Sequence, residues 1–202
     1  MSEVDHVLND GRRLVPITSV AEGNALVRSI RAGASIGLTR MDLSFCDRDV
    51  LLDALVRAGG LDSGRACSTE LMQLICDALE HFNCAVRDLY LVRISNQHAE
   101  MLSRALTVNL SLRCVIVDGS HEINWVASSV VVSVLGVYYS DDTYNAGTDW
   151  ERIARMPSLR QVQFRARDDA AMDTFRRVWP TRIESENDVL GWTVFTRVNQ
   201  TA

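Results

Sequence analysis

The sequence of 202 residues predicts an α/β fold built from repeated strand–helix units. Short β-like runs alternate along the chain with segments whose apolar residues recur every three to four positions, the period of a helix. Four of the β-like runs share one pattern, with apolar residues at positions 1, 4 and 6, and a fifth matches it more weakly. They are residues 38–43, 86–91, 112–117 and 159–164, and the weaker run is 132–137.

These runs recur at intervals typical of a repeat protein. Their starting positions are separated by 48, 26, 20 and 27 residues, and because 48 is twice 24 we expect a degenerate unit near residues 61–66. Positions 4 and 6 lie two residues apart, so both point to the same side of a strand. We therefore expect a buried core that includes Leu89, Leu91, Leu112, Val115, Val117, Val162 and Phe164.

Helical patterns fill the gaps between the runs. Each expected helix carries an apolar face of helical period, and Ser68 is a suitable N-cap for one of them. Pro157 and Pro180 act as stop signals for two others. The expected helices are residues 20–32, 49–58, 68–82, 99–106, 148–156 and 168–179.

One stretch indicates which repeat class this is. Residues 101–117 contain a helical segment ending in Ala105-Leu106, a turn with Asn109, and then an L-x-x-L-x-L-like run. Residues 38–46 show a longer form of the same run, in which the L-x-x-L-x-L-like pattern is followed by two residues and then Cys46. This pattern resembles the leucine-rich repeat family in its ribonuclease-inhibitor-like subtype, with irregular repeats.

The resemblance implies the architecture. It implies a short α/β solenoid, with parallel strands on the concave face and helices on the convex face. The whole chain, 1–202, would form one domain with repeats over 36–167. Residues 1–35 and 168–202 would be the terminal caps that repeat proteins need to cover their hydrophobic ends.

The composition excludes several kinds of site. All 21 basic residues are arginine, so a Schiff-base lysine, a P-loop lysine and a kinase lysine are excluded. No glycine-rich phosphate loop is present, and we expect no cofactor. The histidines, at 6, 81, 98 and 121, do not pair at i, i+3 or i+4, so we expect no metal site.

Cysteine usage and charge predict the setting. Five cysteines without a C-x-x-C pair fit a reducing compartment, and no apolar run is long enough to span a membrane. With no secretory signal, we expect an intracellular protein, cytoplasmic or cytoskeletal. The net charge of −5 and the acidic neighbours of the arginine clusters argue against nucleic-acid binding.

Two segments invite a catalytic interpretation. Gly33-Ala34-Ser35-Ile36-Gly37 matches the nucleophile elbow G-x-S-x-G, but the elbow needs a strand before the serine, and here a helix precedes it. The loop from Asp118 to Glu122, with Ser120 and His121, is the densest polar cluster. A small hydrolase-like α/β enzyme that uses Asp118, His121 and Glu122 is therefore the alternative hypothesis. Because Asp-Gly-Ser is common turn chemistry, we expect no catalysis.

The favoured hypothesis is a binding module. In stacked repeats, the residues between and after the inward positions line the concave sheet face, and Tyr and Arg are the types that anchor protein interfaces. We expect a non-catalytic adaptor or subunit of a larger assembly that binds a protein partner through this face. The alternative is that these residues are ordinary half-exposed strand residues, since strands favour tyrosine. The expected partner-binding residues are Phe45, Tyr90, Arg93, Asp118, Tyr138, Tyr139 and Arg165.

Overall fold

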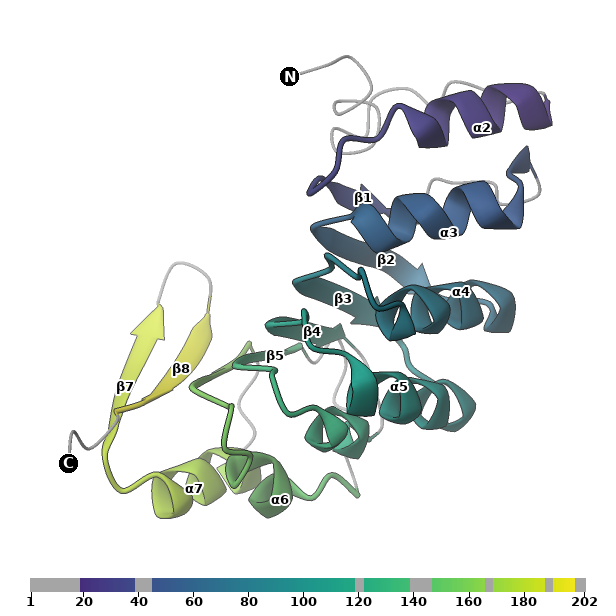
Figure 1. Cartoon of the computed structure of the whole chain (residues 1–202). Helices are drawn as coiled ribbons and strands as arrows, with labels where there is room; N and C mark the ends of the chain where they lie inside the picture. The colour runs from purple at the N-terminus through teal and green to yellow at the C-terminus, as the bar shows by residue number, and fades with distance from the viewer. Residues whose placement is uncertain are drawn as a thin grey trace.

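The computed structural model of the chain, shown in Figure 1, describes residues 19–38, 45–118, 122–138, 147–165, 169–187 and 191–198. Within these residues the fold is mixed α/β, with an open eight-stranded sheet and six α-helices. The helices are α2 (Val20–Arg28), α3 (Arg48–Arg57), α4 (Thr69–Glu80), α5 (Asn96–Val108), α6 (Trp150–Ala154), α7 (Asp169–Val178) and the 3-10 helix η3 (Asn124–Ser128). The strands are β1 (Ser35–Gly37), β2 (Gly60–Ala66), β3 (Asp88–Val92), β4 (Cys114–Asp118), β5 (Val134–Tyr138), β6 (Gln161–Phe164), β7 (Arg182–Asn187) and β8 (Trp192–Arg197).

The strand order follows the chain through the first six strands. The sheet runs β1-β2-β3-β4-β5-β6-β8-β7, with every pair from β1 to β6 parallel. The last two strands form an antiparallel hairpin, and β8 rather than β7 pairs with β6. A doubly wound sheet reverses its strand order at a switch point, and β1 to β6 contain no such reversal.

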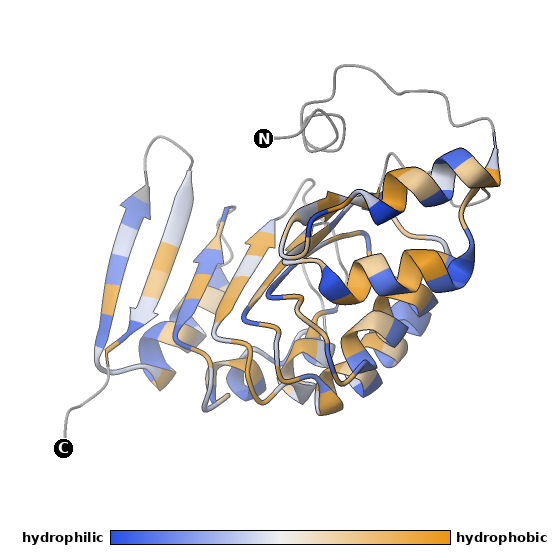
Figure 2. Cartoon of the chain, turned by 45° about the horizontal axis from the view of Figure 1, so that its top comes forward, coloured by the Kyte–Doolittle hydropathy of each residue, from blue (hydrophilic) through white to orange (hydrophobic). Residues whose placement is uncertain are grey.

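The elements lie in a curved row. In Figure 1 the strands line the inner side of the curve and the helices its outer side, and the β7–β8 hairpin stands at the far end from α2. Figure 2 shows hydrophilic and hydrophobic residues alternating along the strands at the carboxyl-terminal end. We call the surface of the sheet that faces away from the helices the inner face.

The core is a set of aligned rows on the helix side of the sheet. One row follows the register from Ile36 to Leu61, Leu89 and Val115, and on to Leu135, Val162 and Phe195. Every residue of this row is buried, and so are all seven residues expected from the 1-4-6 pattern. The core prediction is therefore confirmed.

Capping groups explain where several elements begin. Ser68 is the N-cap of α4, as expected, and its hydroxyl accepts a hydrogen bond from the Leu71 N–H. The buried Asn109 follows α5: its side-chain oxygen accepts from the N–H groups of Ser111 and Leu112, and its amide donates to the Leu79 carbonyl. Such side-chain bonds satisfy backbone groups that a buried turn would otherwise leave without a partner.

The first two units differ from expectation. The strand expected at 38–43 is β1, at Ser35–Gly37, and Leu38 is the buried residue that follows it. Residues 39–44 lie outside the described part of the chain. The degenerate unit is real, since β2 spans Gly60–Ala66 and pairs with both β1 and β3.

The helices also differ in detail. The expected helix 68–82 ends at Glu80, and Phe82, expected on its apolar face, is 88% exposed. The helix α2 ends at Arg28 and α6 covers only Trp150–Ala154. Between β4 and β5 only 20 residues separate Val115 from Leu135, and the 3-10 helix η3 takes the place of an α-helix there.

Candidate functional site

Neighbouring strands bring the candidate residues together on the inner face. The register places Val92, Asp118 and Tyr138 side by side on β3, β4 and β5. Arg165 follows β6 directly, and its backbone N–H donates to the Val137 carbonyl at 3.1 Å. Because side chains alternate along a strand, Tyr90 projects to the same face as Val92, away from the buried Leu89 and Leu91.

Aromatic rings form the centre of this surface. The rings of Tyr90 and Tyr138 meet edge to face with centroids 6.1 Å apart, and Tyr138 meets Trp192 edge to face at 4.3 Å. The guanidinium carbon of Arg165 lies 5.3 Å from the centroid of the Tyr138 ring. We call Tyr90, Asp118, Tyr138, Arg165 and Trp192 the aromatic cluster. Edge-to-face and cation–π contacts of this kind hold large side chains in defined positions.

A hydrogen bond orients the polar part of the cluster. The Tyr90 hydroxyl donates to Oδ2 of Asp118 at 3.3 Å, across 28 residues of sequence. Burial, reinforced by the negative charge of Asp118, raises the pKa of Tyr90 to about 12. Burial also raises the pKa of Tyr138. Both phenols are therefore neutral hydrogen-bond donors at physiological pH.

One carboxylate oxygen of the cluster has no hydrogen-bond partner among the described residues. The buried Oδ1 of Asp118 accepts no hydrogen bond from them, although Oδ2 accepts from Tyr90. A buried acceptor without a donor is costly, by about 1–3 kcal/mol.

Trp192 is a member of the cluster that sequence reasoning did not name. It begins β8, which lies antiparallel between β6 and β7, so it lies near Arg165 although 26 residues separate the two along the chain. The run Trp192-Thr-Val-Phe-Thr-Arg197 is rich in aromatic and β-branched residues and so predicts a strand, but a pattern of repeated parallel strands does not predict that this strand pairs with β6.

The remaining expected binding residues are Phe45, Arg93 and Tyr139. Phe45 is not in a strand, and its backbone lies against α2: a Cβ on Gly23 would be 1.9 Å from the Phe45 carbonyl oxygen. Arg93 is exposed just after β3 in the left-handed region, with φ 53°, and its N–H donates to the Asp118 carbonyl at 2.7 Å. Tyr139 lies outside the described residues.

The two described residues of the loop proposed for catalysis, Asp118 and Glu122, lie on different sides of the sheet. Asp118 lies on the inner face with Tyr90, whereas Glu122 lines a cavity on the helix side of the sheet. His121, which an acid–base mechanism would need, lies outside the described residues. In the G-x-S-x-G segment, Gly33 has φ +83° and Ser35 opens β1, so the turn precedes the strand and is not a nucleophile elbow.

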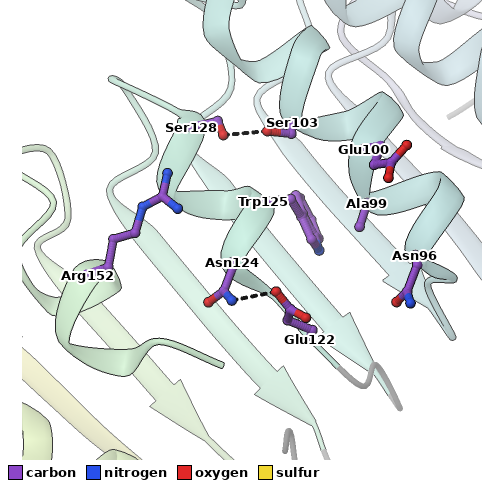
Figure 3. A pocket seen from close by; sticks show the side chains of 9 residues that line it. All are labelled: Asn96, Ala99, Glu100, Ser103, Glu122, Asn124, Trp125, Ser128 and Arg152. Atoms are coloured by element: carbon purple, nitrogen blue, oxygen red, sulfur yellow. Dashed lines mark hydrogen bonds between the residues drawn. The ribbon is translucent and has the colours of Figure 1, made fainter. Parts of the chain in front are cut away.

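The helix-side cavity has a volume of about 360 Å³ and lies where η3 interrupts the row of α-helices (Figure 3). Its polar contacts are internal: Asn124 donates to Glu122 at 2.5 Å, and the hydroxyls of Ser103 and Ser128 share a hydrogen bond at 2.6 Å. Trp125 is only 4% exposed, and its indole N–H has no acceptor. The residues that line it are Asn96, Ala99, Glu100, Ser103, Glu122, Asn124, Trp125, Ser128 and Arg152.

The described residues contain no group of three or more His, Cys, Asp and Glu side chains placed to hold a metal ion. None of the five cysteines forms a disulfide, and burial raises the pKa of Cys76 to about 12 and of Cys114 to about 11. Within the same described ranges, no helix combines the length and apolar character that a membrane span requires.

The sequence was also compared with known proteins. No protein-family model matches the chain, and no curated protein matches it.

Proposed function

We propose that this chain is a non-catalytic binding module that holds a protein partner on its inner face. The observation that carries the proposal is the aromatic cluster. Four strands and the residue that follows β6 bring two tyrosines, a tryptophan, an arginine and an aspartate onto one surface. Tyr, Trp and Arg are the types most enriched among residues that dominate binding energy.

The geometry favours binding of a large partner over binding of a small molecule. The cluster lies on the open side of the sheet, which no described helix covers in Figure 1. Rings that are held by their neighbours lose little rotational freedom on binding, so they supply contact area at low entropic cost. Asp118 and Arg165 add charged groups of opposite sign beside the rings.

The architecture we propose is a short, irregular solenoid of the leucine-rich repeat type. Three observations support it: the chain order of β1 to β6, core positions spaced by 20 to 28 residues from Ile36 to Val162, and the burial of positions 1, 4 and 6 from the Val86 unit onwards. In such a solenoid the inner face is a continuous binding surface. Five free cysteines support an intracellular, reducing location as part of this proposal.

The alternative, a small α/β enzyme, has no observation in its favour. Asp118 and Glu122 face different sides of the sheet, and the helix-side cavity is lined by hydroxyls and carboxylates without a histidine, lysine or cysteine. The hydroxyls of Ser103 and Ser128 bond to each other and Glu122 accepts from Asn124, so neither hydroxyl is hydrogen-bonded to a carboxylate that could act as its base.

Site-specific photocrosslinking tests the proposal. A benzophenone amino acid is placed at Gln163, on the inner face, and separately at Gln73, an exposed glutamine of α4 on the helix side. Both variants are irradiated in extract from the native cells, and the adducts are resolved by mass and identified. We expect one dominant protein adduct at position 163 and none of that mass at position 73. An adduct found equally at both positions, or only at 73, contradicts the proposal.

A further inference from the structure

A second surface of the molecule is unusual in its charge. The connections that lead from each helix to the next strand all lie at the end of the sheet where β1 to β6 begin, and we call this the amino-terminal edge. Its residues are 29–34, 58–59, 81–87, 109–113, 129–133 and 155–160. These segments contain five arginines and no aspartate or glutamate, although the whole chain has 26 acidic and 21 basic residues.

Three of these arginines occupy equivalent positions and form a line. The Arg113 N–H donates to the Arg87 carbonyl at 2.8 Å, the Ser133 N–H to the Arg113 carbonyl at 2.9 Å, and the Arg160 N–H to the Ser133 carbonyl at 2.8 Å. Neighbouring strands lie about 4.8 Å apart, so Arg87 and Arg113 are adjacent like charges. Such a pair is unfavourable unless an anion lies between them.

Within the described residues no carboxylate pairs with these arginines, although Asp88 follows Arg87 in the chain and lies in register with Cys114. The side chains of Arg87, Arg113 and Arg160 are exposed, and none of them forms an ion pair within the described part of the chain. The helix-side arginines behave differently, since Arg57 pairs with Asp53 and Arg177 with Glu151.

The side chains of Arg87, Arg113 and Arg160 also do not bond the carbonyl groups at the ends of the described helices. Arginines often bond the last carbonyls of a helix, as Arg182 does with the carbonyls of Arg176 and Trp179. The guanidinium of Arg113 donates only to the carbonyl of its neighbour Leu112, at 3.2 Å. The side chains of Arg87 and Arg160 donate no hydrogen bond to a described residue.

A hollow lies beside Arg87 and Arg113. It has a volume of about 580 Å³, and its other walls are small side chains: Gly33, Gly59, Cys84, Ala85 and Ser111. Gly59 lies so close to Gly33 that a Cβ on Gly59 would be 2.1 Å from the Gly33 carbonyl oxygen. No acidic residue lines the hollow, so it can receive a carboxylate between two guanidinium groups, which bind carboxylates through paired hydrogen bonds.

Two exposed apolar side chains belong to the same connections as residues that line the hollow. Phe82 is 88% exposed and Leu110 is 69% exposed, the two highest values among the large hydrophobic residues of the described chain. They belong to the same connections as Cys84 and Ser111, and the bond from Asn109 to the Leu79 carbonyl ties these two connections together. Isolated exposed apolar residues are common, but an apolar pair beside a cationic hollow is a feature of interaction sites.

We propose that the amino-terminal edge is a binding site for an acidic, partly apolar segment of a protein partner. A carboxylate of that segment lies between Arg87 and Arg113, and an apolar side chain contacts Phe82 and Leu110. A protein is favoured over a nucleic acid because phosphodiesters make no use of Phe82 and Leu110. The net charge of −5 also opposes a long polyanion more than a short acidic segment. This site is separate from the aromatic cluster and does not depend on it.

A peptide library tests the proposal. Random peptides displayed on phage are selected on the full chain, and the enriched peptides are synthesised with a fluorescent label. Their dissociation constants are measured by fluorescence polarisation for wild type, R87E/R113E and F82S/L110S. The control is R65E/R104E, which changes two exposed arginines away from the edge. A second control, W192A, removes an aromatic residue of the inner face.

We expect peptides that combine Asp or Glu with Leu or Phe, and weakening by about tenfold or more in R87E/R113E. F82S/L110S weakens binding as well, while R65E/R104E and W192A leave it unchanged. The proposal is overturned if no peptide is enriched, if the peptides carry no excess of acidic residues, or if R87E/R113E binds them like wild type. It is also overturned if a labelled single-stranded oligonucleotide binds the edge more tightly than the peptides do. Binding lost only in W192A overturns this site and leaves the inner-face proposal intact.

Discussion

The hydroxyl of Tyr90 donates a hydrogen bond to Asp118 at 3.3 Å, and this bond joins two adjacent strands on the inner face. It holds the Tyr90 ring against Tyr138, which in turn contacts Trp192 and Arg165. The consequence is a preorganised cluster, whose side chains are positioned before any partner arrives. Preorganisation lowers the cost of binding because fewer rotamers are lost.

The pH dependence of stability tests the environment of Tyr90. Its pKa in the folded protein, about 12, is raised above the ordinary value of 10, so the folded state holds this proton more tightly than the unfolded state. The contribution of Tyr90 is fully present below pH 10 and is lost as the pH rises from 10 to 12. Cys76 and Cys114 titrate in the same window, so the comparison is made against Y90F. Urea unfolding at pH 9 and pH 11.5 is expected to show a smaller loss for Y90F than for wild type, and an equal loss contradicts the assignment.

Truncating a buried core leucine is expected to cost more stability than truncating an exposed one. Leu91 is fully buried on β3, and L91A is expected to lower the free energy of unfolding by about 2–4 kcal/mol through lost burial and a new cavity. Leu110, which is 69% exposed, is the matched control, and L110A is expected to change stability by no more than about 0.5 kcal/mol. Chemical denaturation measures both. Similar losses for the two variants are incompatible with the register described here.

Removing the buried side-chain amide of Asn109 is expected to destabilise the protein. N109A removes the acceptor for two backbone N–H groups and the donor to the Leu79 carbonyl, in a position that water reaches poorly. We expect a loss of about 1–3 kcal/mol in the free energy of unfolding. Asn83, which is exposed in the preceding unit, serves as the control through N83A. Thermal unfolding of the two variants is compared under the same conditions. The prediction is wrong if N109A is as stable as N83A.

Two glycines are expected to differ because their constraints differ. Gly33 has φ +83° with open space around it, so G33A costs only backbone strain, about 1–2 kcal/mol. Gly59 has no room for a side chain, since its Cβ would collide with the Gly33 carbonyl. We therefore expect G59A to lower the unfolding free energy more than G33A, as measured in urea. The reverse order contradicts the packing of these two turns.

Much of the fold could be predicted from the sequence because large apolar residues occupy positions 1, 4 and 6 in most of the repeated units. At Val86-Leu89-Leu91 and Leu112-Val115-Val117 all positions are buried, as expected. The β2 unit was harder to recognise, because its equivalent buried positions include the small residues Ala58 and Ser63. The hydroxyl of Ser63 accepts a hydrogen bond from the Val92 N–H and so is satisfied without an apolar partner.

The first strand was misplaced for a related reason. Leu38-x-x-Met41-x-Leu43 imitates the repeat pattern, while the residues that pair with β2 begin at Ser35, where Gly33 stands at the position that should be apolar. For the site, alternation along the strands correctly brought Tyr90, Asp118, Tyr138 and Arg165 to one face. Trp192 could not be placed, because nothing local in β8 specifies that it pairs antiparallel with β6.

The affinity of the partner recovered by crosslinking at Gln163 tests the central claim most directly. Its dissociation constant is measured by titration calorimetry for wild type, for R165A/W192A, and for Q73A as a helix-side control. We predict a loss of about tenfold or more for R165A/W192A, since truncating an interface anchor costs about 2 kcal/mol or more, with unfolding temperature nearly unchanged. Q73A is predicted to bind like wild type. Equal affinities for R165A/W192A and wild type would contradict the claim that the inner face holds the partner.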